Sequence, residues 1–449
     1  MTYRYRCTPL LLACLMWATA PTALPADNPL VLPMRERAQV IDGLLNDKIR
    51  NTLPGLMRRS GIDMWIIIAR EYNEDPVIET LLPATWLGAR RRTILVVYDP
   101  GGEQALETLA VARYAVGEQF EKAWDKERQP DQWSRLAEIV AERDPERIGI
   151  NRSRDWGLAD GIAATDLALL EQSLAPVYRE RIVSAEALAV AWLETRTAAE
   201  MRIYPHIVRI THEIIAEAFS DRVIQVGVTT SSDVVWWLRE RTRELRLTTW
   251  FHPSVSIQRA DAARFDQVEA FSNHKPEQVI LPGDLLHVDF GITYLRLNTD
   301  TQQHAYVLRP GERDAPAYLK KALAAANRLQ DIFTGNFRAG DTGNAVLARS
   351  REQAITEGIK PSIYTHPLGY HGHAAGTTLG MWDSQGGVPG SGDYPLHPDT
   401  VYSIELNAAS EIRDWNKEIR IMLEEDAFFD GEKVRYLDGR QTEFILIPN

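Results

Sequence analysis

The sequence predicts a mixed α/β (α+β) protein, with a smaller N-terminal α/β domain over residues 27–190 and a larger C-terminal domain over residues 191–449. Three observations support this prediction. The chain has 449 residues, more than one ordinary hydrophobic core organises. Strand-like apolar runs alternate with helical periodicity in its first part. In its last third, four strand-like segments each contain or adjoin an acidic side chain.

The first 26 residues have the layout of a secretory signal peptide. Arg4 and Arg6 precede a short apolar run, Pro9 to Trp17, and small residues and proline follow as far as Ala26. Because the run is too short to span a bilayer, we expect cleavage near Ala26 and a periplasmic or secreted protein without membrane insertion. The sequence LLAC, which ends at Cys14, weakly resembles a lipoprotein box, so a lipid anchor at Cys14 is the less favoured alternative.

Helices and strands alternate from about residue 40 to residue 179. The elements expected there are a helix over 41–57, strands over 64–69 (MWIIIA), 93–98 (TILVVY) and 147–150, and helices over 131–141 and 165–174. This alternation predicts a small α/β domain, and it contains neither a glycine-rich phosphate loop nor a cluster of candidate ligands. A long amphipathic helical stretch over 187–219 follows, which Pro205 is expected to kink or interrupt.

Five potential metal ligands follow in the last third of the chain, in the order Asp289, Asp300, His366, Glu405, and Glu424 or Glu425. Four carboxylates and one imidazole suit two adjacent divalent cations of the Mn, Fe, Co or Zn type, because the carboxylates cancel the four positive charges. Such a pair of cations can share a water, lower its pKa and polarise the carbonyl that it attacks. Each residue alone is more often a strand-end, turn or structural residue, but adjacent antiparallel strands can bring the whole set onto one face. The set predicts metal-assisted hydrolysis.

The segment from about Ala198 to Asn449 resembles the catalytic domain of the pita-bread metallopeptidases, the family of methionine aminopeptidase, prolidase and aminopeptidase P. Asp289 and Asp300 are eleven positions apart, the family's spacing between its first two ligands. His366 stands in H-P-L-G, which matches the family's H-x-x-G, and Glu405 stands in S-I-E. The resemblance implies a pita-bread fold that binds two divalent cations.

The fifth ligand is open between two neighbouring glutamates. The family shows R-I-E-D, and this chain shows Arg420-Ile421-Met422-Leu423-Glu424-Glu425-Asp426. Alignment on E-D alone favours Glu425, whereas an apolar residue just before the glutamate and the hydrophobic run after it favour Glu424. Glu424 is the preferred ligand, with Glu425 as the alternative. We expect Arg420 to hold a ligand carboxylate from behind.

The resemblance also suggests roles for groups that contact the substrate. His373 follows His366 by seven positions, where the family has a histidine that contacts substrate or intermediate. His371 is an additional catalytic candidate, and His252 lies in a segment similar to the family's substrate pocket. We expect these histidines to donate hydrogen bonds to the carbonyl oxygen, and Glu405 to move the proton from water to the leaving nitrogen.

Composition excludes several classes of function. The only cysteines, Cys7 and Cys14, lie in the expected signal peptide, so the mature chain has no thiol nucleophile, Cys-ligated zinc or redox motif. Loss of Arg4 and Arg6 changes the formal net charge from −12 to −14, since no acidic residue precedes Asp27. This charge argues against nucleic acid and anionic membranes as partners.

The leading hypothesis is an exported dinuclear metallopeptidase that hydrolyses the Xaa-Pro bond of dipeptides or short peptides. Manganese is the favoured metal, with Co, Zn or Fe as alternatives. The N-terminal domain is similar to the creatinase-type domain that packs against a neighbouring subunit, which implies a homodimer.

Two other hypotheses stay open. One is a same-fold non-peptidase, either a C–N hydrolase similar to creatinase or an iron-dependent lyase. The other is a catalytically silent binding protein. The complete ligand set counts against metal-free creatinase chemistry and against silent binding. Because Ala374-Ala375-Gly376 follows His373 where the family commonly has an acidic residue, a non-peptidase is not eliminated.

Overall fold

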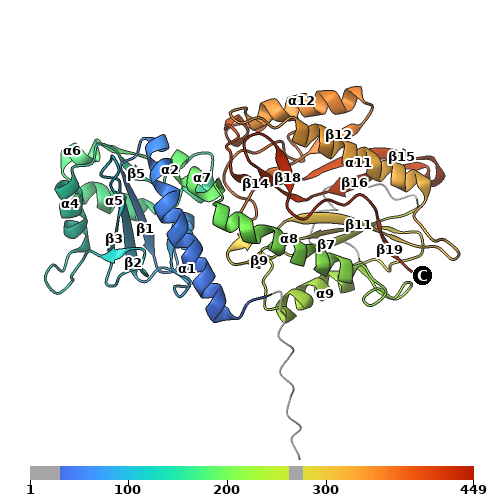
Figure 1. Ribbon diagram of the computed structural model, residues 1–449, viewed down its shortest axis with the longest axis horizontal. Helices are drawn as coiled ribbons and strands as arrows, with labels where there is room; N and C mark the ends of the chain where they lie inside the picture. The colour runs from blue at the N-terminus through green and yellow to red at the C-terminus, as the bar shows by residue number, and fades with distance from the viewer. Residues whose placement is uncertain (1–30, 262–276) are drawn as a thin grey trace, which may run out of the picture.

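The computed structural model describes residues 31–261 and 277–449. The expected signal peptide, with Cys14 and the cleavage point near Ala26, lies outside these residues. Figure 1 shows two regions, one with a single sheet and one with several, and the α/β class expected from the sequence is confirmed. Within the two described ranges, no helix has both the length and the apolarity needed to cross a membrane.

The N-terminal region is built on one mixed six-stranded sheet with the order β4-β3-β2-β1-β5-β6. Its strands are β1 (Met64–Arg70), β2 (Arg92–Tyr98), β3 (Glu107–Val111), β4 (Glu121–Lys122), β5 (Ile148–Ile150) and β6 (Ile182–Ser184). The central strand β1 pairs antiparallel with β2 and parallel with β5. The sheet therefore contains the three strands expected from the sequence and adds three short ones at its edges.

Helices cover both faces of this sheet, which explains the unbroken apolar run of β1. Trp65 and Ile67 pack into one core, Ile66 and Ile68 into the other. The helices of this region are α1 (Met34–Asn51), α2 (Leu53–Ser60), α3 (Pro76–Leu81), α4 (Gln132–Arg143), η1 (Gly157–Ala159), α5 (Ala164–Ser173), α6 (Pro176–Arg179) and α7 (Glu186–Glu194). The first core lies under α1, α2, α3 and α7, the second under α4 and α5.

Two helix predictions need correction. The single helix expected over 41–57 is α1 followed by α2, because Pro54 has no N–H to donate to the carbonyl four residues earlier. The stretch expected over 187–219 is α7 followed by α8 (Ala198–Ala218), and Pro205 lies inside α8 without ending it. Thr197 starts α8 through a capping box, in which its hydroxyl accepts from Glu200 N and its own N–H donates to the Glu200 carboxylate. The predicted domain boundary at residue 190 falls inside α7.

The C-terminal region contains three larger sheets, ordered β19-β11-β8-β7, β12-β15-β16 and β13-β14-β17-β18, and the hairpin β10-β9. Its strands are β7 (Ser254–Gln258), β8 (Leu285–Phe290), β9 (Thr293–Tyr294), β10 (Leu297–Asn298), β11 (Thr301–Val307), β12 (Lys360–Ile363), β13 (His366–Leu368), β14 (Thr400–Ser403), β15 (Leu406–Ile412), β16 (Lys417–Leu423), β17 (Asp426–Phe429), β18 (Val434–Tyr436) and β19 (Ile445–Ile447). Its other helices are α9 (Ser231–Glu244), α11 (Ala317–Gly335), α12 (Gly343–Thr356), η2 (Ser391–Asp393) and η3 (Arg413–Trp415).

The sheets lie between two pairs of helices (Figure 1). Helices α8 and α9 pack on the sheet that contains β8 and β11, and α11 and α12 pack on the strands around β15. Each pair buries an apolar face against its sheet, so the hydrophobic effect holds the layers together. The space between the sheets is where polar strand ends meet.

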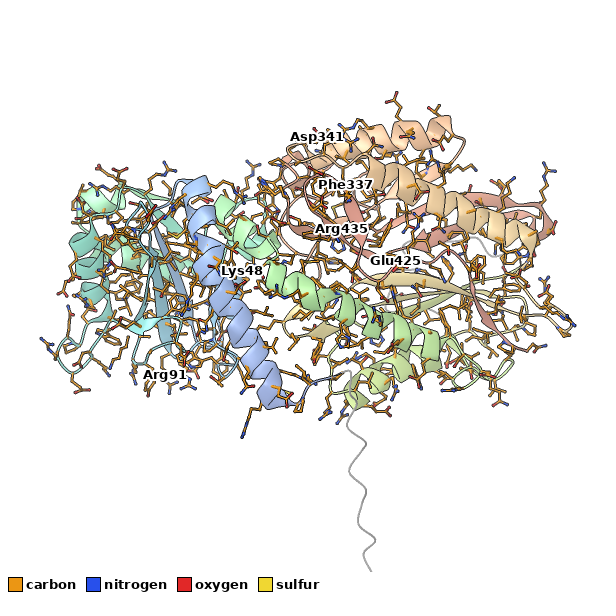
Figure 2. All side chains as sticks on the ribbon, viewed as in Figure 1. Lys48, Arg91, Phe337, Asp341, Glu425 and Arg435 are labelled. Carbon is orange, nitrogen blue, oxygen red and sulfur yellow. The ribbon has the colours of Figure 1, made fainter. Side chains whose placement is uncertain are left out.

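A buried cation links the two regions (Figure 2). The ammonium group of Lys48 on α1 is fully buried over the rings of Trp192 and Tyr370, 4.8 and 4.5 Å from their centroids. It lies 4.0 Å from Glu200 Oε1, and Arg196 Nη1 lies 3.2 Å from the same oxygen. The loop that contains Tyr370 is thus packed against both regions, and the same loop continues into His371 and His373.

Candidate metal centre

All five candidate ligands lie at or next to the ends of strands. Asp289 lies near the end of β8, Asp300 immediately precedes β11, and His366 begins β13. Glu405 lies between β14 and β15, and Glu424 between β16 and β17. Two of the strand-like segments of the last third, TVYSIEL and EIRIMLEEDAFF, both break at their glutamates. At each break the chain crosses from one sheet to another, which turns the acidic side chain into the space between the sheets.

Strand register explains how residues far apart in the sequence meet. Gln302 on β11 pairs with Asp289 on β8 and forms an isolated bridge with Glu424. His366 pairs with Ser403 on β14. The pair β8 and β11 and the pair β13 and β14 therefore approach each other, and each pair brings candidate ligands to the space between the sheets.

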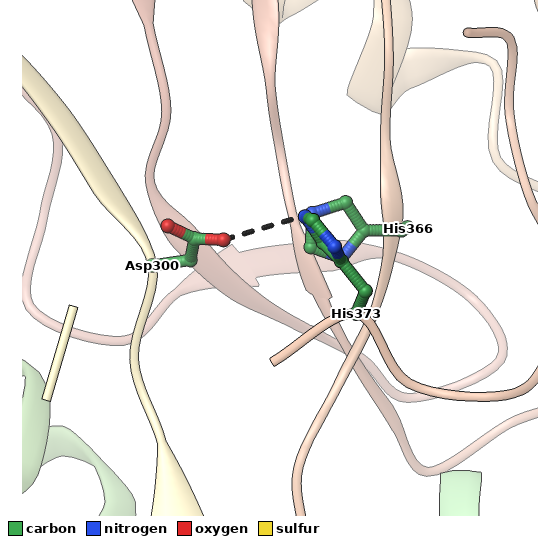
Figure 3. A group of neighbouring side chains, drawn as sticks. All are labelled: Asp300, His366 and His373. Atoms are coloured by element: carbon green, nitrogen blue, oxygen red, sulfur yellow. Dashed lines mark ion pairs between the residues drawn. The ribbon is translucent and has the colours of Figure 1, made fainter. Parts of the chain in front are cut away.

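The five side chains form overlapping groups. His366, Glu405 and Glu424 make one group and Asp289, Asp300 and Glu424 make another; within each group the potential ligand atoms lie within 4.8 Å of one another. Glu424 belongs to both groups. A third group contains Asp300, His366 and His373, and Figure 3 shows the Asp300 carboxylate facing the two imidazoles. A carboxylate shared between two groups of potential ligands suits two adjacent cations.

The carboxylates crowd one another in a buried space. Burial, followed by the charges of its neighbours Glu424 and Asp289, raises the pKa of Asp300 well above its ordinary value. The pKa of Glu405 is also well above its ordinary range, through burial and then Glu424 and Asp289. Burial and Asp289 raise the pKa of Glu424 to about 8. Without positive charge nearby, these groups favour the protonated form, because several buried anions side by side are unfavourable.

His366 has the chemistry of a neutral nitrogen ligand. Its Nδ1 lies 3.0 Å from the carbonyl oxygen of Pro367, so Nδ1 carries the proton and Nε2 has the lone pair. Nε2 is buried without a hydrogen-bond partner in the described part of the chain, 3.7 Å from Asp300 Oδ2 and 3.8 Å from Glu424 Oε1. Burial, together with His373, lowers the pKa of His366 to about 3.

The two neighbouring glutamates face opposite directions. Glu424 lines the space between the sheets, where its Oε1 accepts from Ser403 Oγ at 2.6 Å. Glu425 faces away, and its carboxylate contacts His212 Nε2 at 2.8 Å and accepts from the Gln441 backbone N–H at 2.9 Å and Gln303 Nε2 at 3.1 Å. Of the two alternatives that the sequence left open, the geometry favours Glu424.

A cavity of about 560 Å³ opens onto the carboxylates. Its lining combines them with aromatic and apolar side chains; it consists of Trp250, Phe251, Asp289, Asp300, Gln302, Ser362, Tyr364, His373, Trp382, Glu405, Leu406, Asn407, Met422 and Glu424. His373 is held edge-on by His366 and Trp250, with ring centroids 4.6 and 5.1 Å apart. Burial lowers the pKa of His373, which favours a neutral imidazole. The cavity can hold an apolar substrate group beside a hydrogen-bond donor.

Three other residues proposed from the sequence do not reach the cluster. His371 is absent from the cavity wall, and its pKa is lowered to about 4 by burial and by Arg196. His252 packs edge-on against Trp236 at 5.3 Å. Arg420 donates to Asn407 Oδ1 at 2.7 Å rather than to a ligand carboxylate, since it lies four residues before Glu424 on β16.

Gln302 is the functional residue that the sequence analysis missed. Its Nε2 donates to Glu405 Oε1 and to Glu424 Oε2, both at 2.7 Å. The signal in the sequence is the polar run Thr-Gln-Gln-His at the start of a strand-like segment, and the structure shows that this strand, β11, is buried along its whole length. Buried polar side chains must find polar partners, and those of Gln302 are two candidate ligands.

The residues present fit a pair of divalent cations. Three buried carboxylates, the half-buried carboxylate of Asp289 and one neutral imidazole nitrogen supply the oxygen and nitrogen donors that Mn, Fe, Co or Zn accept. The unpartnered Nε2 of His366 and the raised pKa values of the carboxylates both show a need for positive charge at this position.

Solved structures with the same fold are peptidases that differ greatly in sequence from this chain. The X-Pro aminopeptidase from Thermotoga maritima MSB8 is 15% identical with a TM-score of 0.62, and the match covers 88% of this chain and 100% of that one. The Xaa-Pro dipeptidase from Bacillus anthracis is 16% identical with a TM-score of 0.58, covering 92% and 100%. The prolidase from Pyrococcus horikoshii OT3 is 13% identical with a TM-score of 0.55, covering 90% and 99%. No curated protein matches the chain.

The sequence matches a family model for metallopeptidases. The matching family is metallopeptidase family M24, and the match runs over residues 204–428, half of the chain. It contains every residue of the carboxylate and histidine cluster, so the family signal and the geometry coincide. The pita-bread fold expected from the sequence is confirmed, and the chain belongs to metallopeptidase family M24.

Proposed function

We propose that this metallopeptidase hydrolyses the peptide bond before proline in dipeptides or short peptides, with two divalent cations held by Asp289, Asp300, His366, Glu405 and Glu424. The observation that carries the proposal is the pair of overlapping ligand groups that share Glu424 beside one cavity. Manganese is the favoured metal, and Co, Zn or Fe suits the same donors.

The chain's own residues supply the remaining chemistry. When bound, the two cations would lower the pKa of a shared water and polarise the scissile carbonyl. Glu405 lines the cavity beside the other carboxylates, so its carboxylate takes the proton of the attacking water and passes it to the leaving nitrogen. His373, in its neutral form, donates an N–H to the carbonyl oxygen as negative charge develops.

Preference for proline is supported by the shape of the site and by proteins of similar fold. Trp250, Phe251, Tyr364 and Trp382 give the cavity apolar walls that suit a rigid pyrrolidine ring. The solved structures with the same fold include an X-Pro aminopeptidase, an Xaa-Pro dipeptidase and a prolidase. We further propose that the protein is exported after removal of residues 1–26 and acts as a homodimer.

Metal content and a peptide panel test this function. Elemental analysis of the purified protein loaded with Mn²⁺ should give two metals per chain, and the loaded protein should release the first residue from Ala-Pro or Ala-Pro-Ala. A chelator should abolish the activity. Hydrolysis of Ala-Ala as fast as Ala-Pro would reject proline preference, and a fully metallated protein that cleaves no peptide would favour a non-peptidase reaction.

A further inference from the structure

We propose that Gln302 is a positioning residue that holds Glu405 and Glu424 in the orientation that binds cations, and that His287 and Ser256 hold Gln302 in turn. The inference rests on the proposed function, because it assumes that these carboxylates are ligands. It adds three residues that lie outside the ligand set.

Gln302 bridges two carboxylates with one amide nitrogen. Its Nε2 has two hydrogens and lies 2.7 Å from Glu405 Oε1 and 2.7 Å from Glu424 Oε2. The side chain is buried, and the backbones of Gln302 and Glu424 exchange hydrogen bonds of 3.0 and 3.2 Å. The amide is therefore fixed at its backbone end before any cation binds.

The other end of the amide is fixed by a histidine. Gln302 Oε1 lies 2.8 Å from His287 Nε2, so this nitrogen carries the proton and donates it. His287 Nδ1 then accepts from the hydroxyl of Ser256 at 3.2 Å. Ser256 and His287 are direct partners on β7 and β8, and Gln302 is on the next strand, β11.

The two glutamates set which atom of the amide faces them. In the opposite orientation, Gln302 Oε1 would face the two carboxylate oxygens, a repulsive contact once a bound cation keeps both glutamates ionised. In the donor orientation Oε1 can accept from His287 Nε2–H while His287 Nδ1 accepts from Ser256, so this chain of hydrogen bonds stabilises the donor orientation. With both donors in place, one oxygen of each glutamate is occupied and neither carboxylate can rotate freely away from its neighbour.

Loss of this restraint should weaken cation binding more than it weakens the fold. Residues that orient metal ligands typically contribute about 10- to 100-fold to metal affinity. Glu424 keeps a second restraint from Ser403 Oγ at 2.6 Å, so part of the site survives without Gln302. We therefore expect weaker binding rather than complete loss.

The test compares two glutamines that are adjacent on β11. Gln302→Met keeps the length of the side chain and removes both donors. Gln303→Met is the matched control, because Gln303 is also buried and donates to a carboxylate, Glu425 Oε1 at 3.1 Å, which faces away from the cluster. Each variant loses buried amide–carboxylate hydrogen bonding from the same strand, so a purely structural effect should appear in both.

The measurements are Mn²⁺ titration calorimetry of the chelator-stripped full chain and thermal unfolding of the same samples. Gln302→Met should raise the Kd for Mn²⁺ by about 10- to 100-fold, and Gln303→Met should change it by less than about threefold, although both lower the Tm. An equal Kd for the two variants would overturn the proposal.

A second variant keeps the proposal testable if Gln302→Met does not fold. His287→Phe touches neither carboxylate, and it should still weaken Mn²⁺ binding at least about tenfold through the freed amide. An unchanged Kd in His287→Phe would overturn the role of the chain of hydrogen bonds. Wild-type protein that binds Mn²⁺ but cleaves no peptide would reject the proposed substrate and leave this inference standing, whereas wild-type protein that binds no Mn²⁺ would reject both.

Discussion

The metal-free protein should lose stability as the pH rises from about 5 to about 8, and Mn²⁺ should remove the part of that loss that comes from the carboxylate cluster. Burial and the charge of Asp289 raise the pKa of Glu424 from 4.5 to about 8 in the folded chain. The unfolded chain ionises near the ordinary value. Below pH 4.5, Glu424 is protonated in both the folded and the unfolded chain, and its ionisation costs the fold no stability. Between this pH and the folded pKa, Glu424 ionises only in the unfolded chain, which lowers the free energy of unfolding.

The magnitude follows from the size of the shift. Each pKa unit is worth about 1.4 kcal/mol, so the rise of Glu424 from 4.5 to about 8 corresponds to on the order of 5 kcal/mol at most. One kcal/mol moves the Tm of a domain of this size by about 2–4 °C. Ionisation of Glu424 should therefore lower the Tm of the metal-free protein by at most roughly 10–20 °C over this pH range, and the elevated pKa values of Asp300 and Glu405 act in the same direction.

The assay is thermal unfolding of chelator-treated and Mn²⁺-loaded protein at half-unit steps from about pH 5 to about pH 8.5. Glu194 provides an internal background, because burial also raises its pKa to about 8 and it lies outside the metal cluster. The effect of Glu194 on the Tm is the same with and without Mn²⁺. The difference between the two profiles of Tm against pH therefore comes from the carboxylate cluster.

Glu424→Gln is the decisive variant. It removes the titrating group, so the metal-free variant should be more stable than metal-free wild type at pH 8 and should show a flatter pH profile. Parallel pH profiles for metal-free and Mn²⁺-loaded wild type would refute the reasoning, as would a metal-free Tm that is constant or rises with pH.

Three further predictions concern the site. Asp300→Ala should lower both metal content and activity, and unchanged stoichiometry by elemental analysis would reject Asp300 as a ligand. His373→Ala should keep both metals and lower kcat roughly ten- to a thousand-fold, whereas His366→Ala should lose metal; the reverse result would show that the two roles are exchanged. Gly372→Ala should lower the Tm and kcat while metal content stays the same. The added Cβ would lie 2.3 Å from the ring of Trp250, which packs against His373. A crystal structure of the variant superposed on wild type would reveal whether that ring moves.

The sequence alone determined the type of fold and the identity of most candidate ligands. The run MWIIIA predicts a buried strand, and β1 is covered by helices on both sides. Asp289, Asp300, His366 and Glu405 were identified from their residue types, their order and the resemblance to the metallopeptidase family, and the structure gathers them. Such features are local, because composition and periodicity reflect the burial of each segment.

Only the tertiary structure could decide between Glu424 and Glu425. Both side chains are buried, so the hydrophobic pattern that favours Glu424 could not settle the choice. The choice depends on where β16 ends and β17 begins, since the chain changes sheets between them and the alternation of strand faces is interrupted at that point.

The same limit applies to the residues around the ligands. Gln302 reaches two carboxylates more than a hundred positions later in the chain, at a bridge between strands of different sheets. His371 and Arg420 stand near ligands in the sequence, yet their side chains face other partners. Sequence proximity does not fix the direction of a side chain, because that direction depends on which strands pair and in which register.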